Sequence, residues 1–308
     1  VDQAADLARE LGVDIIVSVG GGSVIDTAKA VCVTLKNGGK ADDHVALMRL
    51  TEPQIPHIAI PTTSGTGSEV TNVSVIKSQA AGRKVYIVDN YITPNTAILD
   101  PAFTLGLPPG LTATTAMDAM THAVEALTST MANPICDGHA LQAIRLIREN
   151  LPRVMANSSD EEARGNLQMA ATAAGWAFGI AQVGLAHSMA HTVGMLANVA
   201  HGAACGIVLP AVMRFNVDFA TEKLALAAQA LGVSIGGMEA RDAALAGVEA
   251  LENLMKQAGH PMRLSEVGVT EDILAMAPFH ALADTPTLFN ARPVTDPNEV
   301  AELYKQVF

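Results

Sequence analysis

The spacing of apolar residues changes about one third of the way along the 308-residue chain. Before residue 106, short runs rich in Val and Ile alternate with segments whose apolar residues recur at helical spacing. Residues 1–11 and 23–35 are predicted to be helices, and residues 14–19, 55–60, 85–88 and 97–99 are predicted to be strands. Strands that alternate with helices in this way indicate parallel βαβ units.

Beyond residue 106 the strand pattern ends, and segments rich in Ala, Leu and Met at helical spacing take over. Helices are predicted at 112–127, 134–151, 161–177, 185–196, 221–231 and 239–258. The segment Leu107-Pro108-Pro109-Gly110 marks the expected boundary, because two consecutive prolines neither continue a helix nor fit inside a sheet. We therefore predict an α/β domain at 1–106, followed by an all-helical domain at 107–308.

Composition narrows the function to small-molecule chemistry. A formal net charge of −12 argues against nucleic acid, which requires clustered Lys and Arg, and no polybasic segment suggests a membrane surface. Three cysteines without a close pair fit a reduced cytosol better than a disulfide framework or a thiolate zinc site. We expect a cytoplasmic protein, and the N-terminus has no pattern of a secretion signal.

Residues 168–213 contain no Asp, Glu, Lys or Arg, so a transmembrane segment has to be considered. Ala and Gly are its commonest residues, and Gln182, Asn198, Pro210 and three histidines interrupt it. A spanning helix needs about 20 strongly apolar residues, so closely packed interior helices are the better interpretation.

Two loops follow predicted strands and suit a phosphate group. Gly20-Gly21-Gly22-Ser23 lies between a strand and a helix, where backbone N–H groups and the positive helix end favour an anion. This is not the G-x-G-x-x-G fingerprint, because position 25 is Ile, and an ordinary tight turn is the alternative. The second loop, at 61–71, is rich in Thr, Ser and Gly, and a flexible surface loop is its alternative. Loops at the carboxyl ends of neighbouring strands would face one crevice.

Asp118 and His122 lie four residues apart in a predicted helix, so their side chains share one face. His187 and His191 repeat this spacing, and His201 follows. One such histidine is more often a hydrogen-bonded core residue than a ligand, but several in an uncharged helical region favour a shared divalent cation. Asp with imidazoles suits Fe²⁺ or Zn²⁺, and the residues alone do not choose between these ions.

These motifs together resemble the iron-containing (group III) alcohol dehydrogenase family over the whole chain. The similar segments are the first loop with its helix at 20–29, the second loop at 61–71, and the metal region at 118–122, 187–191 and 201–202. The resemblance implies a Rossmann-like parallel sheet domain and an all-α metal-binding and substrate domain. Family members carry about one more βαβ unit ahead of Val1, including the strand end that selects NAD or NADP. The sheet domain is therefore expected to be N-terminally incomplete.

The resemblance also assigns roles to particular residues. It implies that Fe²⁺ is bound by Asp118, His122, His187 and His201, and that His191 is a proton-relay residue beside the nicotinamide. Phe178 would form a wall of the substrate pocket. The cofactor, NAD or NADP, would contact Gly21, Gly22, Ser23, Asp26, Thr62, Thr63, Thr66, Thr71 and Lys84.

The implied reaction is hydride transfer between NAD(P) and a small primary alcohol or aldehyde, in a homodimer or larger homo-oligomer. A zinc enzyme similar to glycerol dehydrogenase is one alternative, and a catalytically incomplete metal-binding fragment is another. An enzyme of the dehydroquinate synthase type would need extra Lys and Arg, which the region around the histidines lacks. One departure from the family pattern is Asn290-Ala291-Arg292-Pro293, where the family often has Asn-Pro-Arg-Pro.

Overall fold

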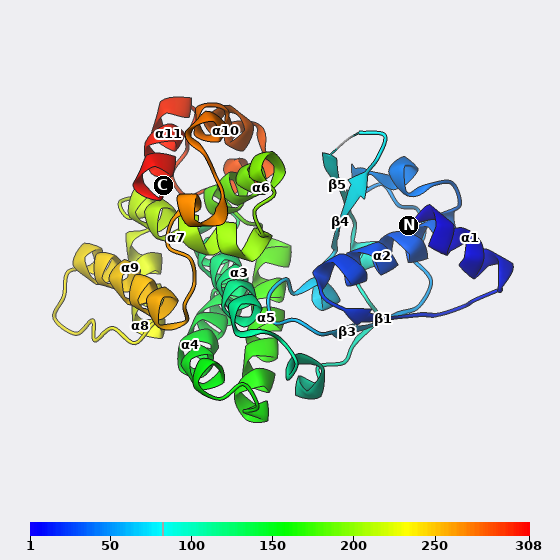
Figure 1. Cartoon of the computed structure of the whole chain (residues 1–308), viewed down its shortest axis with the longest axis horizontal. Helices are drawn as coiled ribbons and strands as arrows, with labels where there is room; N and C mark the ends of the chain where they lie inside the picture. Colours follow the sequence, from blue (N-terminus) through cyan, green and yellow to red (C-terminus); the bar gives the residue numbers. More distant parts are fainter. Residues whose placement is uncertain (82) are drawn as a thin grey trace.

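The computed structural model describes residues 1–81 and 83–308. Its α/β part and its helical part lie side by side, at the right and left of Figure 1. A three-stranded sheet runs in the order β1-β3-β6, with β1 at Ile16–Gly20, β3 at His57–Pro61 and β6 at Thr96–Ala97. All its pairings are parallel, which confirms the prediction of a parallel sheet from the alternating pattern.

A second sheet, in the order β2-β5-β4, includes two strands that the apolar pattern did not predict. Its strands are β2 at Ala46–Leu47, β4 at Val73–Ser78 and β5 at Arg83–Val88, and β4 pairs antiparallel with β5. Strand β4 was missed because two of its buried positions are Ser74 and Ser78. The Ser74 hydroxyl donates a 2.7 Å hydrogen bond to the Asp26 carbonyl, so a polar side chain is satisfied inside.

Helices α1 (Asp2–Glu10) and α2 (Gly22–Asn37) match the predicted helices closely. Helix α2 is tied to β4 and to the loop after β3 by Lys29, whose side chain is completely buried. Its ammonium group donates hydrogen bonds of 2.8 and 2.7 Å to the carbonyls of Thr71 and Val73. Short 3₁₀ helices complete this part: η1 (Ala41–His44), η2 (Ser68–Val70), η3 (Asn90–Ile92) and η4 (Pro101–Thr104).

The second part of the chain is helical, as predicted. Its helices are α3 (Pro109–Thr128), α4 (Pro134–Ala156), α5 (Glu161–Ala181), α6 (Leu185–Ala197), α7 (His201–Asn216), α8 (Thr221–Ala230), α9 (Ala240–Gln257), α10 (Glu271–Ala283) and α11 (Pro297–Gln306), with 3₁₀ helices η5 (Leu264–Val267) and η6 (Thr285–Phe289). Helix α3 is buried along most of its length and contacts α4, α5 and α7.

Three helices, α7, α10 and α11, were not predicted, and proline explains two of them. Pro210 and Pro278 lie inside α7 and α10, where proline normally argues against a helix. Pro109 is the first residue of α3, a position at which its missing N–H costs nothing.

We propose that the chain is divided into two domains, at 1–106 and 107–308.

Within the described residues, no single helix has the length and apolar character needed to span a membrane. Helices α5 and α6 meet those criteria only as a pair, bent by 105°.

A buried Ser–His pair between β1 and β3 makes stability depend on pH. Ser18 Oγ lies 2.7 Å from His57 Nε2, and burial, with a smaller effect of Lys29, lowers the pKa of His57 to about 4. The unfolded chain binds a proton at pH values below about 6.5, whereas the folded chain does not until about pH 4. The contribution is therefore fully present above pH 6.5 and is lost as the pH falls toward 4, by about 3 kcal/mol.

We expect His57→Gln to flatten this acid loss of stability, because Gln can still bond to Ser18 but does not titrate. The measurement is urea unfolding of the metal-free protein at several pH values between 7 and 4. His139→Gln, on helix α4, is the control and should follow the wild type. Equal pH profiles for His57→Gln and the wild type would contradict the prediction.

Candidate metal centre and cofactor cleft

The two glycine-containing loops lie side by side, as the sequence indicated. Strands β1 and β3 are parallel neighbours, and the Thr62 N–H donates a 3.0 Å hydrogen bond to the Gly20 carbonyl at their common end. A Cβ on Gly21 would lie 3.2 Å from Thr63 Cγ2, and a Cβ on Gly22 would lie 2.6 Å from Thr66 Cγ2. The loops thus approach too closely at these two positions to leave room for side chains, and α2 begins at Gly22 of the first loop.

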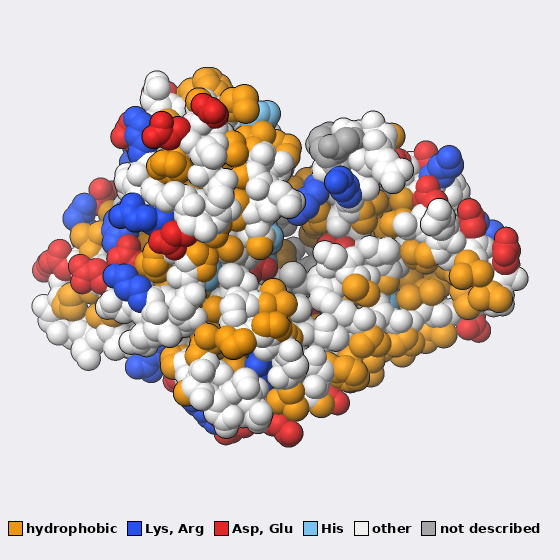
Figure 2. Space-filling view, in the orientation of Figure 1, with side chains coloured by type: hydrophobic (Ala, Val, Ile, Leu, Met, Phe, Trp, Pro, Cys, Tyr) orange, Lys and Arg blue, Asp and Glu red, His pale blue; other side chains and the backbone are white. Residues whose placement is uncertain are grey.

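Among the other predicted cofactor residues, some side chains already have hydrogen-bond partners within the protein and others are exposed. The Asp26 carboxylate accepts hydrogen bonds from Ser68 Oγ at 2.5 Å and the Val75 N–H at 3.0 Å. The Thr71 hydroxyl accepts a 3.2 Å bond from Lys29. These two side chains therefore already have protein partners. Ser23 and Lys84 are exposed, and Figure 2 shows the surface hollowed between the two parts of the chain. Contact of each residue with the cofactor stays a prediction.

One face of helix α5 connects the second loop to the predicted metal region. Its residues are spaced three or four apart: Gln168, Thr172, Gly175 and Phe178. The first three contact the loop through the Pro61 carbonyl (3.2 Å), the Glu69 carboxylate (2.7 Å) and the backbone of Gly67. Gly67 has a φ of +60°, and a Cβ on it would lie 2.7 Å from Gly175 Cα. The Phe178 ring stacks on His122, with centroids 4.2 Å apart.

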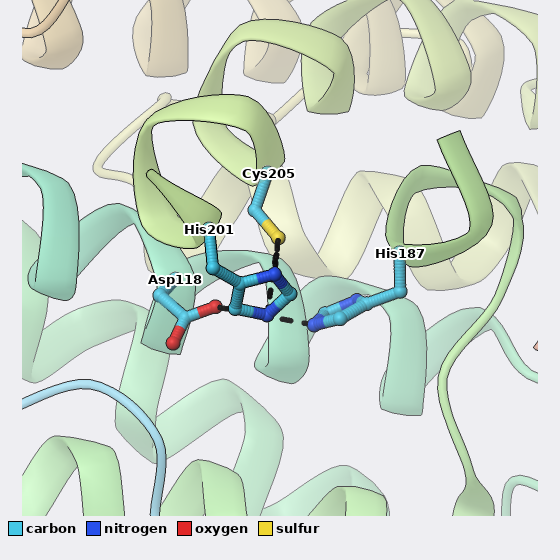
Figure 3. A group of neighbouring side chains, drawn as sticks. All are labelled: Asp118, His187, His201 and Cys205. Atoms are coloured by element: carbon cyan, nitrogen blue, oxygen red, sulfur yellow. Dashed lines mark hydrogen bonds and ion pairs between the residues drawn. The ribbon is translucent and has the colours of Figure 1, made fainter. Parts of the chain in front are cut away.

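Three helices bring the predicted metal ligands together. Asp118 and His122 are on α3, His187 is on α6, and His201 is the first residue of α7. Asp118 Oδ1 lies 4.0 Å from His122 Nδ1, 4.0 Å from His187 Nε2 and 3.4 Å from His201 Nε2. Figure 3 shows Asp118 and His187 on either side of the His201 ring. One carboxylate oxygen is thus the common neighbour of three imidazoles.

The donor atoms of this group fit a divalent cation. Asp118 Oδ1, His122 Nδ1 and His187 Nε2 are buried and have no hydrogen-bond partner among residues 1–81 and 83–308. Burial lowers the pKa of His122 to about 3 and lowers the pKa of His187 and His201 well below the usual value. Burial also raises the pKa of Asp118. Neutral imidazole is the form that binds metal, and a cation would compensate a buried carboxylate.

Glu125, one turn after His122 on α3, supports the group, and sequence reasoning missed it. Its carboxylate lies 2.5 Å from His187 Nδ1 and accepts a 2.6 Å bond from the Ala186 N–H. Burial raises the pKa of Glu125 to about 7, and hydrogen bonds from the backbone oppose that rise. A hydrogen bond donated by Nδ1–H to Glu125 would leave the lone pair on Nε2 of His187, which is the arrangement that can bind a metal ion.

Glu125→Gln is expected to lower the metal affinity about 10–100-fold, because the amide cannot hold the His187 ring and its tautomer as the carboxylate does. Competition with a chelator measures this affinity. Glu149→Gln, which changes an exposed glutamate on α4, is the matched control. An unchanged affinity in Glu125→Gln would show that Glu125 has no such role.

His191 lies next to the group without joining it. Its ring stacks on that of His201 with centroids 5.3 Å apart, and its Nδ1 lies 2.6 Å from Asp284 Oδ2. Asp284 ends helix α10 and was not identified from the sequence, because 93 positions separate it from His191. With Nδ1 facing this carboxylate, Nε2 of His191 remains for proton exchange.

Cys205 is a further member of the group that sequence reasoning missed. It lies on α7, one turn after His201, and is completely buried. Its sulfur and the ligand atoms of Asp118, His187 and His201 all lie within 4.8 Å of one another. Burial, with Asp118 as the second cause, raises the pKa of the Cys205 thiol well above the usual value. The sequence signal was only the spacing of four residues from His201.

A parallel sheet with two paired glycine loops, next to a buried carboxylate–imidazole group in a helical part, is the arrangement expected of an enzyme that binds a nucleotide and a divalent metal ion. Comparisons with known proteins agree with this class. Residues 1–101 match the family described as iron-containing alcohol dehydrogenase, and residues 112–308 match the C-terminal part of the Fe-containing alcohol dehydrogenase family.

Individual relatives match over nearly the whole chain. The NAD-dependent methanol dehydrogenase of Bacillus methanolicus is 38% identical over 305 residues, which cover 99% of this chain and 80% of the relative. The 1,3-propanediol dehydrogenase of Citrobacter freundii is 38% identical over 308 residues, covering 100% and 79%. A solved structure of 1,3-propanediol oxidoreductase superposes with a TM-score of 0.97 at 37% identity, covering 100% of this chain and 80% of that one. The chain therefore belongs to the iron-containing alcohol dehydrogenase family and is an oxidoreductase.

Proposed function

We propose that this enzyme transfers a hydride between NAD(P) and a small primary alcohol or aldehyde, with Fe²⁺ bound by Asp118, His122, His187 and His201. The observation that carries the proposal is a set of buried donor atoms that have no hydrogen-bond partner among the described residues: Asp118 Oδ1, His122 Nδ1 and His187 Nε2. Leaving three such atoms unpaired would cost several kcal/mol, so a cation is the simplest partner for them.

Each part of the site then has a defined task. A divalent ion bound here supplies Lewis acidity, which lowers the pKa of an alcohol and polarises an aldehyde carbonyl. Burial keeps His122, His187 and His201 neutral, and Glu125 orients His187. The Phe178 ring, stacked on His122, would form an apolar wall for a short carbon chain.

Proton movement is assigned to His191. Asp284 holds its Nδ1 and so fixes the ring, while its side chain is 23% exposed and can exchange protons with water. In the direction of alcohol oxidation, Nε2 would accept the hydroxyl proton, and it would return that proton in the reverse direction. The cofactor itself carries the hydride chemistry, so the protein contributes position and electrostatics.

The nicotinamide cofactor is proposed to bind across the paired loops at 20–23 and 61–71. Support comes from the close approach of the two loops beside the first turn of α2, which favours a pyrophosphate. The name of the Bacillus methanolicus relative favours NAD. NADP as cofactor, Zn²⁺ as metal and assembly as a homo-oligomer remain alternatives or predictions for experiment.

The test is to measure the metal content of anaerobically purified protein, together with oxidation of NADH and NADPH in the presence of a short aldehyde. We expect near-stoichiometric iron, turnover, and loss of both in His201→Ala. His139→Ala, a histidine on α4, is the matched control and should keep both. Stoichiometric zinc would favour the glycerol dehydrogenase type of enzyme, and bound metal without turnover would contradict the proposed reaction.

A further inference from the structure

A cysteine lies where the proposed iron site would not require one. The sulfur of Cys205 lies 3.7 Å from Nε2 and 3.9 Å from Nδ1 of His201, and its side chain points at that ring from one turn further along α7 (Figure 3). The other two cysteines, Cys32 and Cys136, are buried on α2 and α4. Cys205 is thus the thiol that the fold places among the donor atoms.

Two donor atoms near this sulfur are a second observation, separate from the cysteine itself, that favours a bound ion. Asp118 Oδ1 and His187 Nε2 belong to side chains that are at least nine-tenths buried, and neither atom has a hydrogen-bond partner in the described part of the chain. One carboxylate oxygen of Asp118, one ring nitrogen each of His187 and His201, and the sulfur of Cys205 all lie within 4.8 Å of one another. One carboxylate, two imidazoles and one thiol together offer four donors, the number that a tetrahedrally coordinated ion takes.

We propose that Cys205 is a metal ligand, and that Asp118, His187, His201 and Cys205 together bind a thiophilic divalent ion such as Zn²⁺ or Co²⁺. This inference rests on the metal centre of the proposed function and adds a second mode of binding, in which Cys205 takes the place of His122. As the bond between sulfur and metal forms, the Sγ–H bond breaks and its proton passes to solvent. The two positive charges of the ion are then matched by one carboxylate and one thiolate.

The choice of ion follows from ligand chemistry. Carboxylate and imidazole ligands suit Fe²⁺ and Zn²⁺, whereas a thiolate shifts a site toward Zn²⁺ and other softer ions. Replacing Cys205 should therefore weaken binding of Zn²⁺ and Co²⁺ much more than binding of Fe²⁺. Replacing His122 should have the opposite selectivity.

The experiment is a titration of the metal-free, full-length protein with Co²⁺, followed by absorption spectroscopy. We expect a near-ultraviolet charge-transfer band from thiolate to cobalt in the wild type, and its loss in Cys205→Ser and Cys205→Ala. Cys136→Ser is the matched control and should keep the band, as should His122→Ala. Competition with a chelator should give a Zn²⁺ affinity about 100-fold lower in Cys205→Ser than in the wild type. Removing a group that only orients a metal ligand lowers affinity about 10–100-fold, and we expect the loss of a ligand itself to reach the upper end of that range.

A second measurement does not depend on any variant folding. X-ray absorption of the Zn²⁺-loaded wild type should contain one sulfur neighbour at about 2.3 Å from the metal. Bound Co²⁺ or Zn²⁺ without sulfur ligation, or a charge-transfer band that persists in Cys205→Ser, would overturn the role of Cys205 and leave the metal centre standing. Failure of the wild type to bind either ion would overturn the metal centre as well, whereas metal binding without alcohol turnover would count only against the proposed reaction.

Discussion

Asp118→Asn is expected to abolish stoichiometric metal binding and to lower kcat/KM about 10³-fold or more. Asp118 Oδ1 is the common neighbour of His122, His187 and His201, at 3.4–4.0 Å from one nitrogen of each. The amide has nearly the same shape but supplies no charge to hold a divalent ion. Lewis acid catalysis is worth several kcal/mol, and each 1.36 kcal/mol corresponds to a factor of ten in rate.

The same substitution should have the opposite effect on the stability of the metal-free protein. Burial raises the pKa of Asp118, so the folded state holds a proton that the unfolded state releases as the pH rises above the usual Asp value. At neutral pH and without a bound cation, the buried, ionised Asp118 carboxylate therefore destabilises the folded state. We expect metal-free Asp118→Asn to melt at or above the temperature of the metal-free wild type, with the order reversed when metal is present.

Metal analysis, steady-state kinetics and thermal melting with and without metal test both effects. Asp137→Asn is the matched control: this aspartate on α4 pairs with Lys223, away from the donor atoms. It should keep its metal content and kcat/KM. If Asp118→Asn retained full metal occupancy, Asp118 would not be a ligand.

Gly202→Ala is expected to lower kcat/KM about 100-fold although it removes no ligand. Gly202 follows His201 in the first turn of α7, and a Cβ at this position would lie 2.3 Å from the Thr114 carbonyl oxygen and 3.3 Å from Asp118 Cβ. The Thr114 carbonyl belongs to the backbone of α3 and cannot rotate away. Helix α7 must therefore shift and carry His201 away from Asp118, and a displacement of about 1 Å in an active site can cost this much.

The measurement is kcat/KM together with metal affinity for Gly202→Ala and for a glycine where a Cβ meets open space. A Cβ added to Gly138, inside helix α4, would meet no described atom within 4 Å outside its own stretch of helix, so Gly138→Ala should be neutral or stabilising by about 0.5–1 kcal/mol. Full activity in Gly202→Ala would contradict the prediction, because it would mean that α7 and α3 accommodate the added Cβ without moving His201.

Local patterns were enough to predict most of the fold. Val and Ile runs predicted the parallel strands β1 and β3, because buried parallel strands are nearly continuous in apolar residues. Strand β4 escaped notice because buried serines interrupt its pattern, and their hydroxyls are satisfied only by contacts distant in sequence. Helices α7 and α10 escaped because each contains a proline that tertiary packing tolerates.

The site was predictable where its residues share a helix. The spacing of four between Asp118 and His122 could be read directly, and the structure places both beside His187. Glu125 and Asp284 could not be assigned, because their histidine partners lie 62 and 93 positions away and no local pattern announces such contacts. Whether each predicted residue binds metal or cofactor stays a prediction until the substitutions above are made.

Helix α5 has a geometric consequence for the reaction. Its face contacts the loop at 61–71 through Gln168 and stacks on His122 through Phe178, which lies ten residues and about 15 Å further along the helix. The helix thereby sets the separation between the proposed pyrophosphate and the proposed site of hydride transfer. Inserting one residue between Thr172 and Phe178 would lengthen it by only about 1.5 Å but rotate its far end by about 100°. An insertion in α5 would therefore disturb the site mainly by turning Phe178 away from His122, and only slightly by changing the distance between the two contacts.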